Sequence, residues 1–386
     1  MPLTRSSAFL IFSGFNFRAV VAFCRALKLA GGRVAIVACT KDDPIFLTAW
    51  RNCVVATRTR RELELEDIRR CLRELSPDRA GEWHLAPTSE FLVRWALENR
   101  EALTECGCLL PLPDSAAYAR VSDKRAFADL CRSRGLSVPG EFPTARESAV
   151  PFVAKPRQNI GASRRTLYPW LLRSAEDVGR FRATEDEREY FFQEWIEGES
   201  YYLLFHLGRD GGATTFSQQN LAQQPGGKSI VLATPATLHL SPATSAWSDA
   251  LRVAGHHGVA MIEVRLHRGG MVLIEANPRL WGPLQLVVDF APEILVAYFD
   301  DVLGRKINRS CRNSRSPARR SYTWLGGARE TWAAGGALDW HVAPPRFPRG
   351  TLLRQIRNDV YFRRDTWRLC LHEWRRGRAA TVPSLQ

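Results

Sequence analysis

The stretch from Met261 to Pro283 constrains the fold of this chain more than any other. Two runs in it, Met261–Leu266 and Met271–Asn277, alternate apolar and polar residues at period two, which predicts two β-strands. Between them, His267-Arg268-Gly269-Gly270 has the composition of a turn. The stretch is therefore predicted to form a β-hairpin with directly paired strands.

Side chains at alternating positions of a strand share a face. We expect two such sets on one side of the hairpin: Met261, Glu263 and Arg265, and Leu273, Glu275 and Asn277. Glu263 and Glu275 then lie on adjacent strands, each between apolar neighbours. Two carboxylates in such a setting repel each other and are costly to desolvate unless a cation lies between them. Hard divalent cations take oxygen ligands, and Asn277 offers a third oxygen.

Arg279 follows Asn277 at i+2 and could face an anion. The hairpin therefore predicts a site for magnesium and phosphate. The alternative is a solvated hairpin face whose charges point to water. The hairpin alone does not distinguish a metal–phosphate site from a solvated face, so the rest of the chain is needed.

Composition narrows the class of protein. The chain has 386 residues, enough for two or three domains, and its 45% hydrophobic and 24% charged content is typical of packed globular domains. The formal net charge of +14 is compatible with binding to nucleic acid, to an anionic membrane surface or to small anionic substrates. No zinc-knuckle or RNA-binding aromatic motif is present, so nucleic acid is not favoured. No apolar run is long enough to cross a bilayer, so no membrane partner is expected.

The nine cysteines are scattered without metal-type spacing, which favours reduced thiols and a cytoplasmic location. At the N-terminus, Ala8–Phe12 and Arg33–Cys39 are predicted strands on either side of a predicted helix over Arg18–Ala30. This β-α-β order predicts a parallel sheet. No G-x-G-x-x-G motif is present, so this is not predicted to be a dinucleotide site. Near the other end, Tyr361–Arg376 is predicted to be helical.

Between the N-terminal unit and the hairpin, charged residues follow the ends of predicted strands and the start of a predicted helix in a definite order. Lys124 opens a predicted helix after Ser122-Asp123, and Lys155 ends a short predicted strand before a small-residue loop. A further predicted strand, Tyr190–Ile196, leads into the acidic segment that ends at Glu199. The ordered motifs are S-D-K (122–124), V-A-K-P (153–156), F-Q-E-W-I-E-G-E (192–199), I-E-V-R (262–265) and L-I-E-A-N-P-R-L-W-G (273–282).

This ordered set resembles the ATP-grasp superfamily over roughly residues 122–303, and within it the carboxylate–amine ligases most. The resemblance implies a mixed α/β and α+β architecture. A Rossmann-like pre-ATP-grasp domain would span 1–115, and an ATP-grasp domain 116–304. Within the latter, a small subdomain would cover about 120–193 and a large subdomain about 194–304. Residues 305–386 would form a basic linker and a Trp- and Arg-rich C-terminal extension.

The resemblance also implies roles for particular residues. Lys124 and Lys155 would hold the phosphates of ATP, and Glu199 would accept the ribose hydroxyls. Glu263, Glu275 and Asn277 would bind two Mg²⁺ ions, for which Mn²⁺ could substitute. The remaining expectations are a lid over Gln158–Arg165 with Gly161 and Ser163, a nucleotide-binding hinge at Gln193, Glu194, Trp195 and Ile196, and catalytic roles for Arg279 and Lys228.

The function so implied is an ATP- and Mg²⁺-dependent ligase. It would activate a small-molecule carboxylate as an acyl phosphate and join it to an amine, giving an amide or peptide bond, ADP and phosphate. A homodimer is compatible with the sequence. One alternative is an ATP-grasp kinase or carboxylase, of the biotin carboxylase or carbamoyl phosphate synthetase type. Another is a non-catalytic, nucleotide-binding regulatory protein whose basic tail binds a partner.

Overall fold

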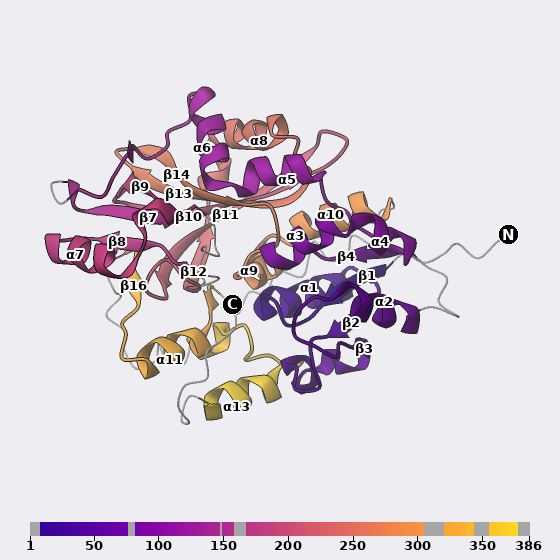
Figure 1. The fold of residues 1–386 in the computed structure, drawn as a ribbon. Coiled ribbons are helices and arrows are strands. Elements are labelled where there is room, and N and C mark those ends of the chain that lie inside the picture. Colours follow the sequence, from indigo (N-terminus) through magenta and orange to yellow (C-terminus); the bar gives the residue numbers. More distant parts are fainter. Residues whose placement is uncertain are drawn as a thin grey trace.

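The structure is a computed structural model that describes residues 8–75, 82–146, 149–157, 167–304, 320–342 and 355–376. Three β-sheets organise it (Figure 1). The predicted lid residues Gly161 and Ser163, and nearly all of the basic linker, lie outside the described residues.

The first sheet is parallel and has the strand order β3-β2-β1-β4-β5; we call it the parallel sheet. Its strands are β1 (Ala8–Phe12), β2 (Val34–Ala38), β3 (Val54–Thr57), β4 (Trp83–Leu85) and β5 (Cys108–Leu109). The helices that connect them are α1 (Phe17–Leu29), α2 (Leu65–Glu74), α3 (Glu90–Glu98) and α4 (Arg100–Glu105). The predicted β-α-β unit is confirmed, and the first strand is entirely buried because helices cover both faces of the sheet.

The second sheet is antiparallel and has seven strands; we call it the large sheet. Six of them follow the order β14-β13-β10-β11-β12-β15, and β16 pairs with β11. Their bounds are β10 (Glu199–Leu207), β11 (Ala213–Gln223), β12 (Ile230–Ala236), β13 (Gly258–His267), β14 (Gly270–Asn277), β15 (Tyr322–Thr323) and β16 (Asp339–Trp340). The predicted hairpin is thus one edge of a continuous sheet, and the C-terminal part of the chain supplies two of its strands.

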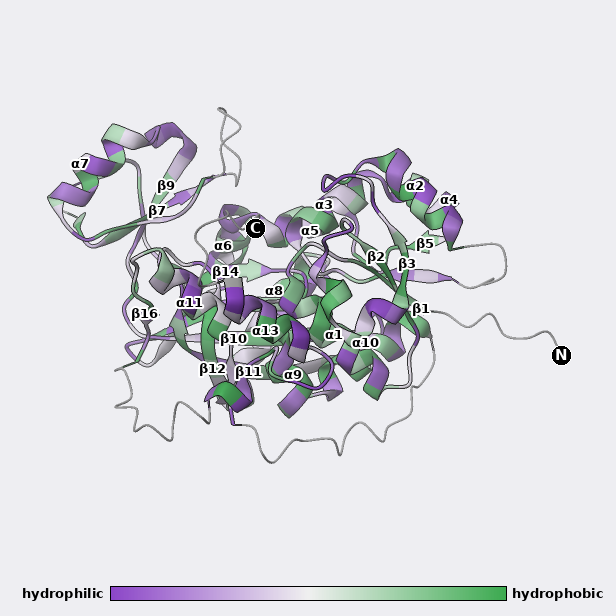
Figure 2. Ribbon diagram, turned by 90° about the horizontal axis from the view of Figure 1, so that it is seen from below, coloured by the Kyte–Doolittle hydropathy of each residue, from purple (hydrophilic) through white to green (hydrophobic). Residues whose placement is uncertain are grey.

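The third sheet, the small sheet, has four antiparallel strands in the order β6-β9-β7-β8. They are β6 (Glu141–Phe142), β7 (Phe152–Pro156), β8 (Trp170–Leu172) and β9 (Tyr190–Glu194). Helix α7 (Ala175–Thr184) covers one of its faces and closes a separate small core. Figure 2 shows this unit standing to one side of the rest of the molecule.

Helices cover both faces of the large sheet. On one face lie α5 (Ser115–Ser122), α6 (Lys124–Ser133) and α8 (Thr244–Val253). On the other lie α9 (Leu284–Phe290) and α10 (Glu293–Leu303), which also pack against α1. The core on this side therefore runs without a break from the parallel sheet to the large sheet. These two sheets are one packed body, and the small sheet has its own core.

The C-terminal segment adds α11 (Leu325–Ala333) and α13 (Trp367–Arg376). The helix predicted over 361–376 is thus too long at its start. Tyr361 and Phe362 instead donate their backbone amides to the carboxylate of Asp359, which holds a turn. Short 3-10 helices complete the described part of the chain: η1 (Pro44–Leu47), η2 (Ala49–Cys53), η4 (Glu187–Glu189) and η5 (Leu238–Leu240).

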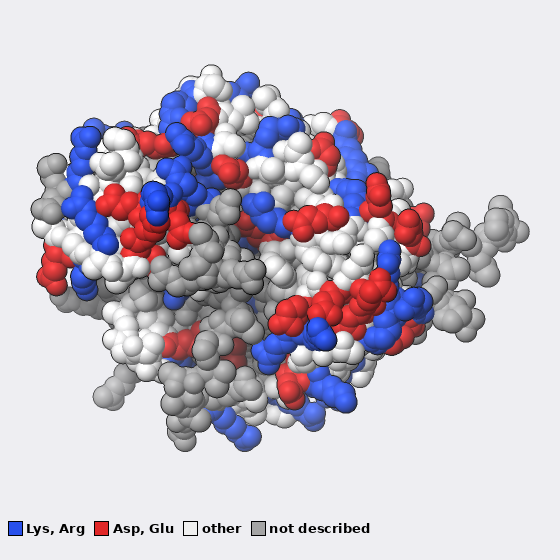
Figure 3. Space-filling view, viewed as in Figure 1, with Lys and Arg blue, Asp and Glu red and all other residues white. Residues whose placement is uncertain are grey.

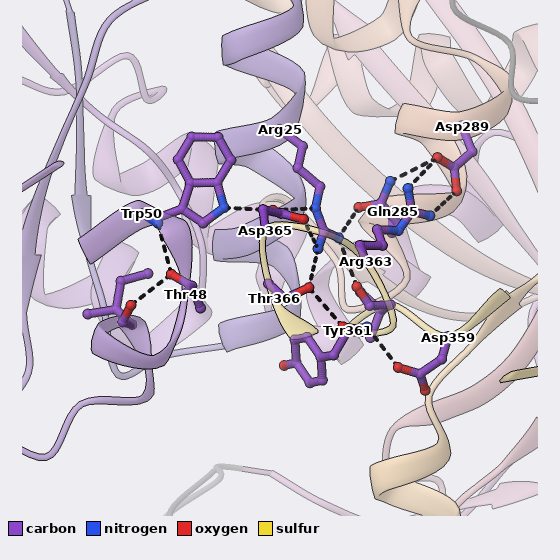
Figure 4. A network of polar contacts seen from close by, with 12 residues as sticks. Arg25, Thr48, Trp50, Gln285, Asp289, Asp359, Tyr361, Arg363, Asp365 and Thr366 are labelled. Atoms are coloured by element: carbon purple, nitrogen blue, oxygen red, sulfur yellow. Dashed lines mark hydrogen bonds and ion pairs between the residues drawn. The ribbon is translucent and has the colours of Figure 1, made fainter. Parts of the chain in front are cut away.

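Buried polar contacts fasten this C-terminal segment to α1 (Figure 4). Arg25 of α1 donates to Asp365 from Nε at 2.8 Å and from Nη2 at 3.0 Å, and also donates to Gln285 and to the Thr366 hydroxyl. Trp50 donates its indole N–H to the same Asp365 carboxylate at 2.9 Å. The C-terminal segment is therefore integral to the fold.

Surface charge is mixed on the face shown in Figure 3, where Lys and Arg alternate with Asp and Glu in many small groups. The net positive charge of the chain thus forms no single stripe on the described part of that face. Among the described residues, no helix combines the length and hydropathy that a membrane span requires.

Candidate active site

The hairpin has the predicted pairing at the end away from its turn. Glu263 of β13 lies directly opposite Glu275 of β14, and Met261 lies opposite Asn277. Arg268 and Gly269 turn the chain with φ angles of 48° and 80°. This is the conformation that a tight hairpin turn requires, and it explains the glycine there.

One part of the expected pattern is wrong. A register shift follows the Glu263–Glu275 pair, so that Val264 pairs with Leu273 and Ile274 is left without a partner residue. Leu273 therefore packs into the core on the opposite face of the sheet from Glu275. A bulge of this kind inserts one residue into one strand and shifts the alternation beyond it.

A hydrogen bond joins the bulge to the small sheet. The backbone carbonyl of Ile274, on the edge strand β14, accepts from Lys155 Nζ of β7 at 2.9 Å. Lys155 belongs to the small sheet and Ile274 to the large sheet, so this bond spans the space between the two. The predicted phosphate lysine and the predicted metal ligands are therefore neighbours.

Lys155 lies in a strongly perturbed environment. Burial and the nearby positive charge of Lys124 lower the pKa of Lys155 to about 8, although Glu275 and Glu263 favour its charged form. Lys124 is half-buried at the start of α6, where the predicted helix begins and the Asp123 carboxylate caps it. The positive charges of the two lysines therefore influence each other.

Glu263 is 9% exposed and accepts a hydrogen bond from the Ser200 hydroxyl at 3.0 Å. Burial, followed by repulsion from Glu275, raises the pKa of Glu263 to about 7. Each of these effects penalises a second negative charge here. A bound cation would remove the penalty, which is the behaviour expected of a metal ligand.

The oxygen ligands predicted beside Glu263 form a chain of contacts. Asn277 donates from Nδ2 to Glu275 Oε1 at 2.7 Å, and Arg279 donates to Asn277 Oδ1 at 3.2 Å. Arg279 also donates to the carbonyl of Leu280 at 2.8 Å, while its Nε has no partner among the described residues. The structure thus brings Arg279 next to the predicted metal ligands.

A buried polar relay behind Glu263 was missed by the sequence analysis. Gln218 donates to Asn220 at 2.8 Å, Asn220 donates to Ser200 at 2.9 Å, and Ser200 donates to Glu263. Tyr202 pairs with both Glu263 and Gln218 across the strands. The sequence did carry one signal for this relay, because polar residues alternate with apolar ones in both strands. The same alternation is typical of a strand with one face in water, so it identifies a buried relay only when helices are known to cover the sheet.

The predicted hinge residues lie where the chain passes from the small sheet to the large one. Gln193 is 4% exposed and its Oε1 has no partner among the described residues. Glu194 is exposed, and its backbone amide donates to the carbonyl of Gly140 at 2.8 Å. Trp195 is half-buried under the guanidinium of Arg265, 5.4 Å from the ring centroid, and Ile196 is buried.

This crossing is fixed to the hairpin. Arg265 donates to the carbonyl of Gly198 at 2.8 Å. A Cβ added to Gly198, whose φ is 139°, would lie 2.0 Å from the carbonyl oxygen of Leu266, so only glycine fits there. Glu199 is exposed and accepts a hydrogen bond from Tyr201 at 2.7 Å.

Lys228 is a predicted catalytic residue for which the structure shows no contact with Lys155, Glu263, Glu275, Asn277 or Arg279. It is exposed in the turn between β11 and β12, with its ammonium 5.1 Å from the centroid of the Tyr168 ring. Its catalytic role stays a prediction, as does the assignment of the individual nucleotide contacts.

The paired positions offer the kind of ligands that a hard divalent cation takes. The donors at the paired positions are two carboxylates and one amide, which is the oxygen set that Mg²⁺ takes. In the described part of the chain, no group of three or more His, Cys, Asp or Glu side chains is placed to hold a metal. The role of the Asn277 amide as a third oxygen ligand stays a prediction. The unpartnered Oε1 of Gln193 adds a buried acceptor on the small-sheet side.

Comparison with known proteins bears on the fold. No protein-family model and no curated protein sequence matches this chain. Among solved structures, it is similar to N5-carboxyaminoimidazole ribonucleotide synthetase in its ADP complex, with a TM-score of 0.58, 15% identity, and 79% of this chain and 80% of the other covered. Biotin carboxylase from Campylobacter jejuni gives a TM-score of 0.59 at 14% identity, with 78% and 72% covered.

The synthetase from Thermus thermophilus gives a TM-score of 0.53 at 16% identity, with 78% of this chain and 79% of the other covered. At these identities the comparisons establish architecture. The shared architecture is a parallel α/β unit followed along the chain by a small sheet and a large antiparallel sheet. The chain has the ATP-grasp fold.

Proposed function

We propose that this protein is an ATP- and Mg²⁺-dependent ligase that activates a small-molecule carboxylate as an acyl phosphate and joins it to an amine. ADP and phosphate are the other products. The observation that carries the proposal is the meeting of Lys155 with the Glu263–Glu275 pair across the space between two sheets. The solved structures with the same fold include complexes with ADP, with an ATP species and with MgADP, which supports a nucleotide at this place.

The chemistry follows from the charges. ATP and a carboxylate are both anions, so they approach each other only where positive charge offsets the repulsion. Mg²⁺, when bound, supplies most of that charge and stabilises the γ-phosphoryl group as it moves. Lys155 holds the phosphates from the small sheet and Lys124 from the start of α6, while Glu263, Glu275 and Asn277 hold the metal from the large sheet.

Arg279 acts at the reacting end in this proposal. Its guanidinium stands next to Asn277, so it faces the transferred phosphoryl group and then the oxyanion that forms when the amine attacks the acyl carbon. The amine nitrogen forms the new C–N bond, the C–O bond to phosphate breaks, and the nitrogen loses a proton. The positions of Gln193 to Ile196 and Glu199 at the crossing support roles for them around the adenosine.

The direct test is to incubate the purified full chain with ATP, Mg²⁺ and a matrix of carboxylates and amines, and to follow ADP and phosphate. Carboxylate- and amine-dependent ADP formation that Glu275→Gln abolishes is the expected result. Stabilisation of the protein by nucleotide without any ADP formation would overturn the proposal in favour of a binding protein.

A second candidate is a carboxylase that activates bicarbonate. It is favoured by the names of the similar structures, which include biotin carboxylase and a 2-oxoglutarate carboxylase domain in complex with bicarbonate. The route is the same, with carboxyphosphate in place of the acyl phosphate. ADP formation that requires bicarbonate and is indifferent to other carboxylates would select it.

A further inference from the structure

A cavity of about 350 Å³ lies at the end of the parallel sheet away from the proposed active site. Val34 and Trp83, the first residues of β2 and β4, line it. The proposed active site instead borders the carboxyl end of β4, where the backbone amide of Leu280 donates to the carbonyl of Pro87 at 2.9 Å. The cavity is therefore separate from the site proposed for ATP and the reacting groups.

The walls of the cavity are largely aromatic and aliphatic. Trp50 of η2 and Trp83 are 7% and 6% exposed, so packing holds their rings in place. Val34 and Ala49 also line the cavity. Small-molecule sites are typically concavities of roughly 300 to 1,000 Å³ with such walls and a small number of polar groups. Indole rings favour a flat ligand, because aromatic rings stack or meet edge to face.

A positive charge lines the same cavity. Lys28 is exposed at the end of α1, and its Nζ lies 5.8 Å from the centroid of the Trp50 ring. It forms no ion pair within the described residues. Its charge offsets part of the rise that burial causes in the pKa of the Cys53 thiol, which also lines the cavity. The ammonium is thus close enough to the cavity to attract an anion.

The carboxylate of Asp365 also lines the cavity, but its charge is already offset. Asp365 accepts from Arg25 at 2.8 and 3.0 Å and from the Trp50 indole at 2.9 Å (Figure 4). With that carboxylate paired, the ammonium of Lys28 is the charge that a ligand can still neutralise. An anion with a flat apolar body fits this combination of a cation and aromatic walls.

Two distant parts of the chain build the cavity. Trp50 belongs to the N-terminal unit and Asp365 to the C-terminal segment, so the cavity is complete only while that segment is docked against α1. A ligand that contacts both walls binds the docked arrangement selectively. By mass action, its binding stabilises the docking.

We propose that this cavity is a binding site for a small organic anion with a flat apolar body, of the class of aromatic carboxylates. Its ring lies against the indoles of Trp50 and Trp83, and its carboxylate pairs with Lys28. The site is distinct from the one proposed for the reacting carboxylate and amine. The ligand is therefore an effector, and its binding holds the C-terminal segment against α1.

The test follows alkylation of Cys53, which is half-buried in the lining. The full-length protein is treated with iodoacetamide in the presence of 2-naphthoate, and modification of each thiol is measured by peptide mass spectrometry. Saturable protection of Cys53 is expected. Cys39, also half-buried but beyond the carboxyl end of β2, should stay unprotected. Absence of protection at Cys53 up to the solubility limit of 2-naphthoate would overturn the proposal.

The neutral analogue 2-naphthamide tests the role of charge, because it keeps the ring and removes the anion. It should need about fivefold more compound for half-maximal protection, and Lys28→Met should weaken binding of 2-naphthoate by about the same factor. Lys41→Met, beyond the other end of β2, should leave the affinity unchanged. Equal protection by the two compounds in the parent protein would overturn the proposal.

A second variant fills the cavity. Ala49 is exposed at the start of η2, so Ala49→Phe adds bulk to the lining without removing a core contact. Calorimetric titration should show binding of 2-naphthoate weakened by about tenfold or more, because the ligand ring loses its place against the indoles. Unchanged affinity in Ala49→Phe would mean that 2-naphthoate binds elsewhere, which would also overturn the proposal.

Limited proteolysis tests the link to the C-terminal segment. Saturating 2-naphthoate should slow cleavage near α13 in the parent protein and not in Ala49→Phe. Unchanged cleavage of the parent protein would overturn the proposed effect on docking. These measurements need neither ATP nor substrate, so their outcome is independent of whether the proposed ligase activity is found.

Discussion

Lys155 donates to the backbone carbonyl of Ile274 at 2.9 Å, and this bond joins the small sheet to the bulge in the large one. Ile274 directly precedes Glu275 on β14, the edge strand of the large sheet. The ammonium therefore lies beside the Glu263–Glu275 pair. A triphosphate bound in this space would replace one neutral acceptor of the ammonium, the carbonyl of Ile274.

The pH dependence of ATP binding follows from Lys155. Its pKa of about 8 means that the folded protein loses the ammonium at a pH where a free lysine keeps it. Phosphate binding needs the charged form, so the KM for ATP is expected to rise as the pH increases above 8. Steady-state ADP formation from pH 6.5 to 9.5 measures this.

The same shift affects stability with a defined sign. The folded-state pKa of Lys155 lies below its ordinary value of 10.5, so between pH 8 and 10.5 the unfolded chain binds more protons. This group therefore adds stability as the pH rises through that window.

Variants of Lys155 test the pH dependence of ATP binding. Lys155→Arg, which stays charged, should flatten the rise in the KM for ATP, and Lys155→Met should raise this KM roughly tenfold or more at every pH. A Lys41→Met control should match the parent protein.

Removing one carboxylate of the pair should separate activity from stability. Glu263→Gln keeps an acceptor for Ser200 and removes a buried charge that repels Glu275, so the thermal midpoint should rise or stay unchanged at pH 8. ADP formation should fall about 100-fold or more, because a metal ligand that stabilises the transferring phosphoryl group is lost. A variant that is less stable and still fully active would contradict the metal assignment. Glu98→Gln, on the exposed surface of α3, is the matched control.

The relay behind Glu263 predicts an effect on metal affinity. Ser200→Ala removes the hydroxyl that orients Glu263 and leaves Asn220 without its acceptor. Partners that orient a metal ligand typically contribute about 10- to 100-fold in affinity. The Mg²⁺ concentration for half-maximal ADP formation should therefore rise by about tenfold, with a smaller change in the rate at saturating Mg²⁺. Ser217→Ala, which removes an equally buried hydroxyl bonded to His239, should leave the Mg²⁺ requirement unchanged.

The contacts of the C-terminal segment predict a loss of stability. Asp365→Ala leaves the buried guanidinium of Arg25 without its carboxylate and Trp50 without its acceptor. Breaking a buried ion pair from one side costs about 3 kcal/mol. Urea unfolding should show a loss of that order, and limited proteolysis should cut near α13 first. Asp186→Ala, which breaks the exposed pair with Arg188, should change the free energy of unfolding by less than about 0.5 kcal/mol.

Local pattern was enough to predict much of the architecture. Period-two alternation identified both strands of the hairpin, and the Glu263–Glu275 pairing followed from it. The bulge at Ile274 could not be predicted, because the alternation of a single strand does not show where its register with the next strand shifts. Strand β12 was not predicted. Pro235 lies within it, opposite Gln218, and a proline weakens the local pattern of a strand.

Contacts between distant parts of the chain account for the remaining differences. No local pattern joins the residues after 320 to the large sheet, because Tyr322 and Thr323 form too short a strand to stand out. The start of α13 was misplaced because Tyr361 is held in a turn by Asp359 rather than continuing the periodic segment. Domain boundaries and the lid over residues 158–165 stay predictions.

The Arg25–Asp365 contact has a consequence for how the protein is made. The two residues are 340 positions apart, so Arg25 leaves the ribosome long before its carboxylate exists. Until then α1 carries a guanidinium that it cannot bury against the sheet without cost. The N-terminal unit of the nascent chain should therefore remain loosely packed and open to chaperones, and it should become protease-resistant only when the segment after Asn358 has emerged. The last part of the chain to be translated thus completes the packing of the first.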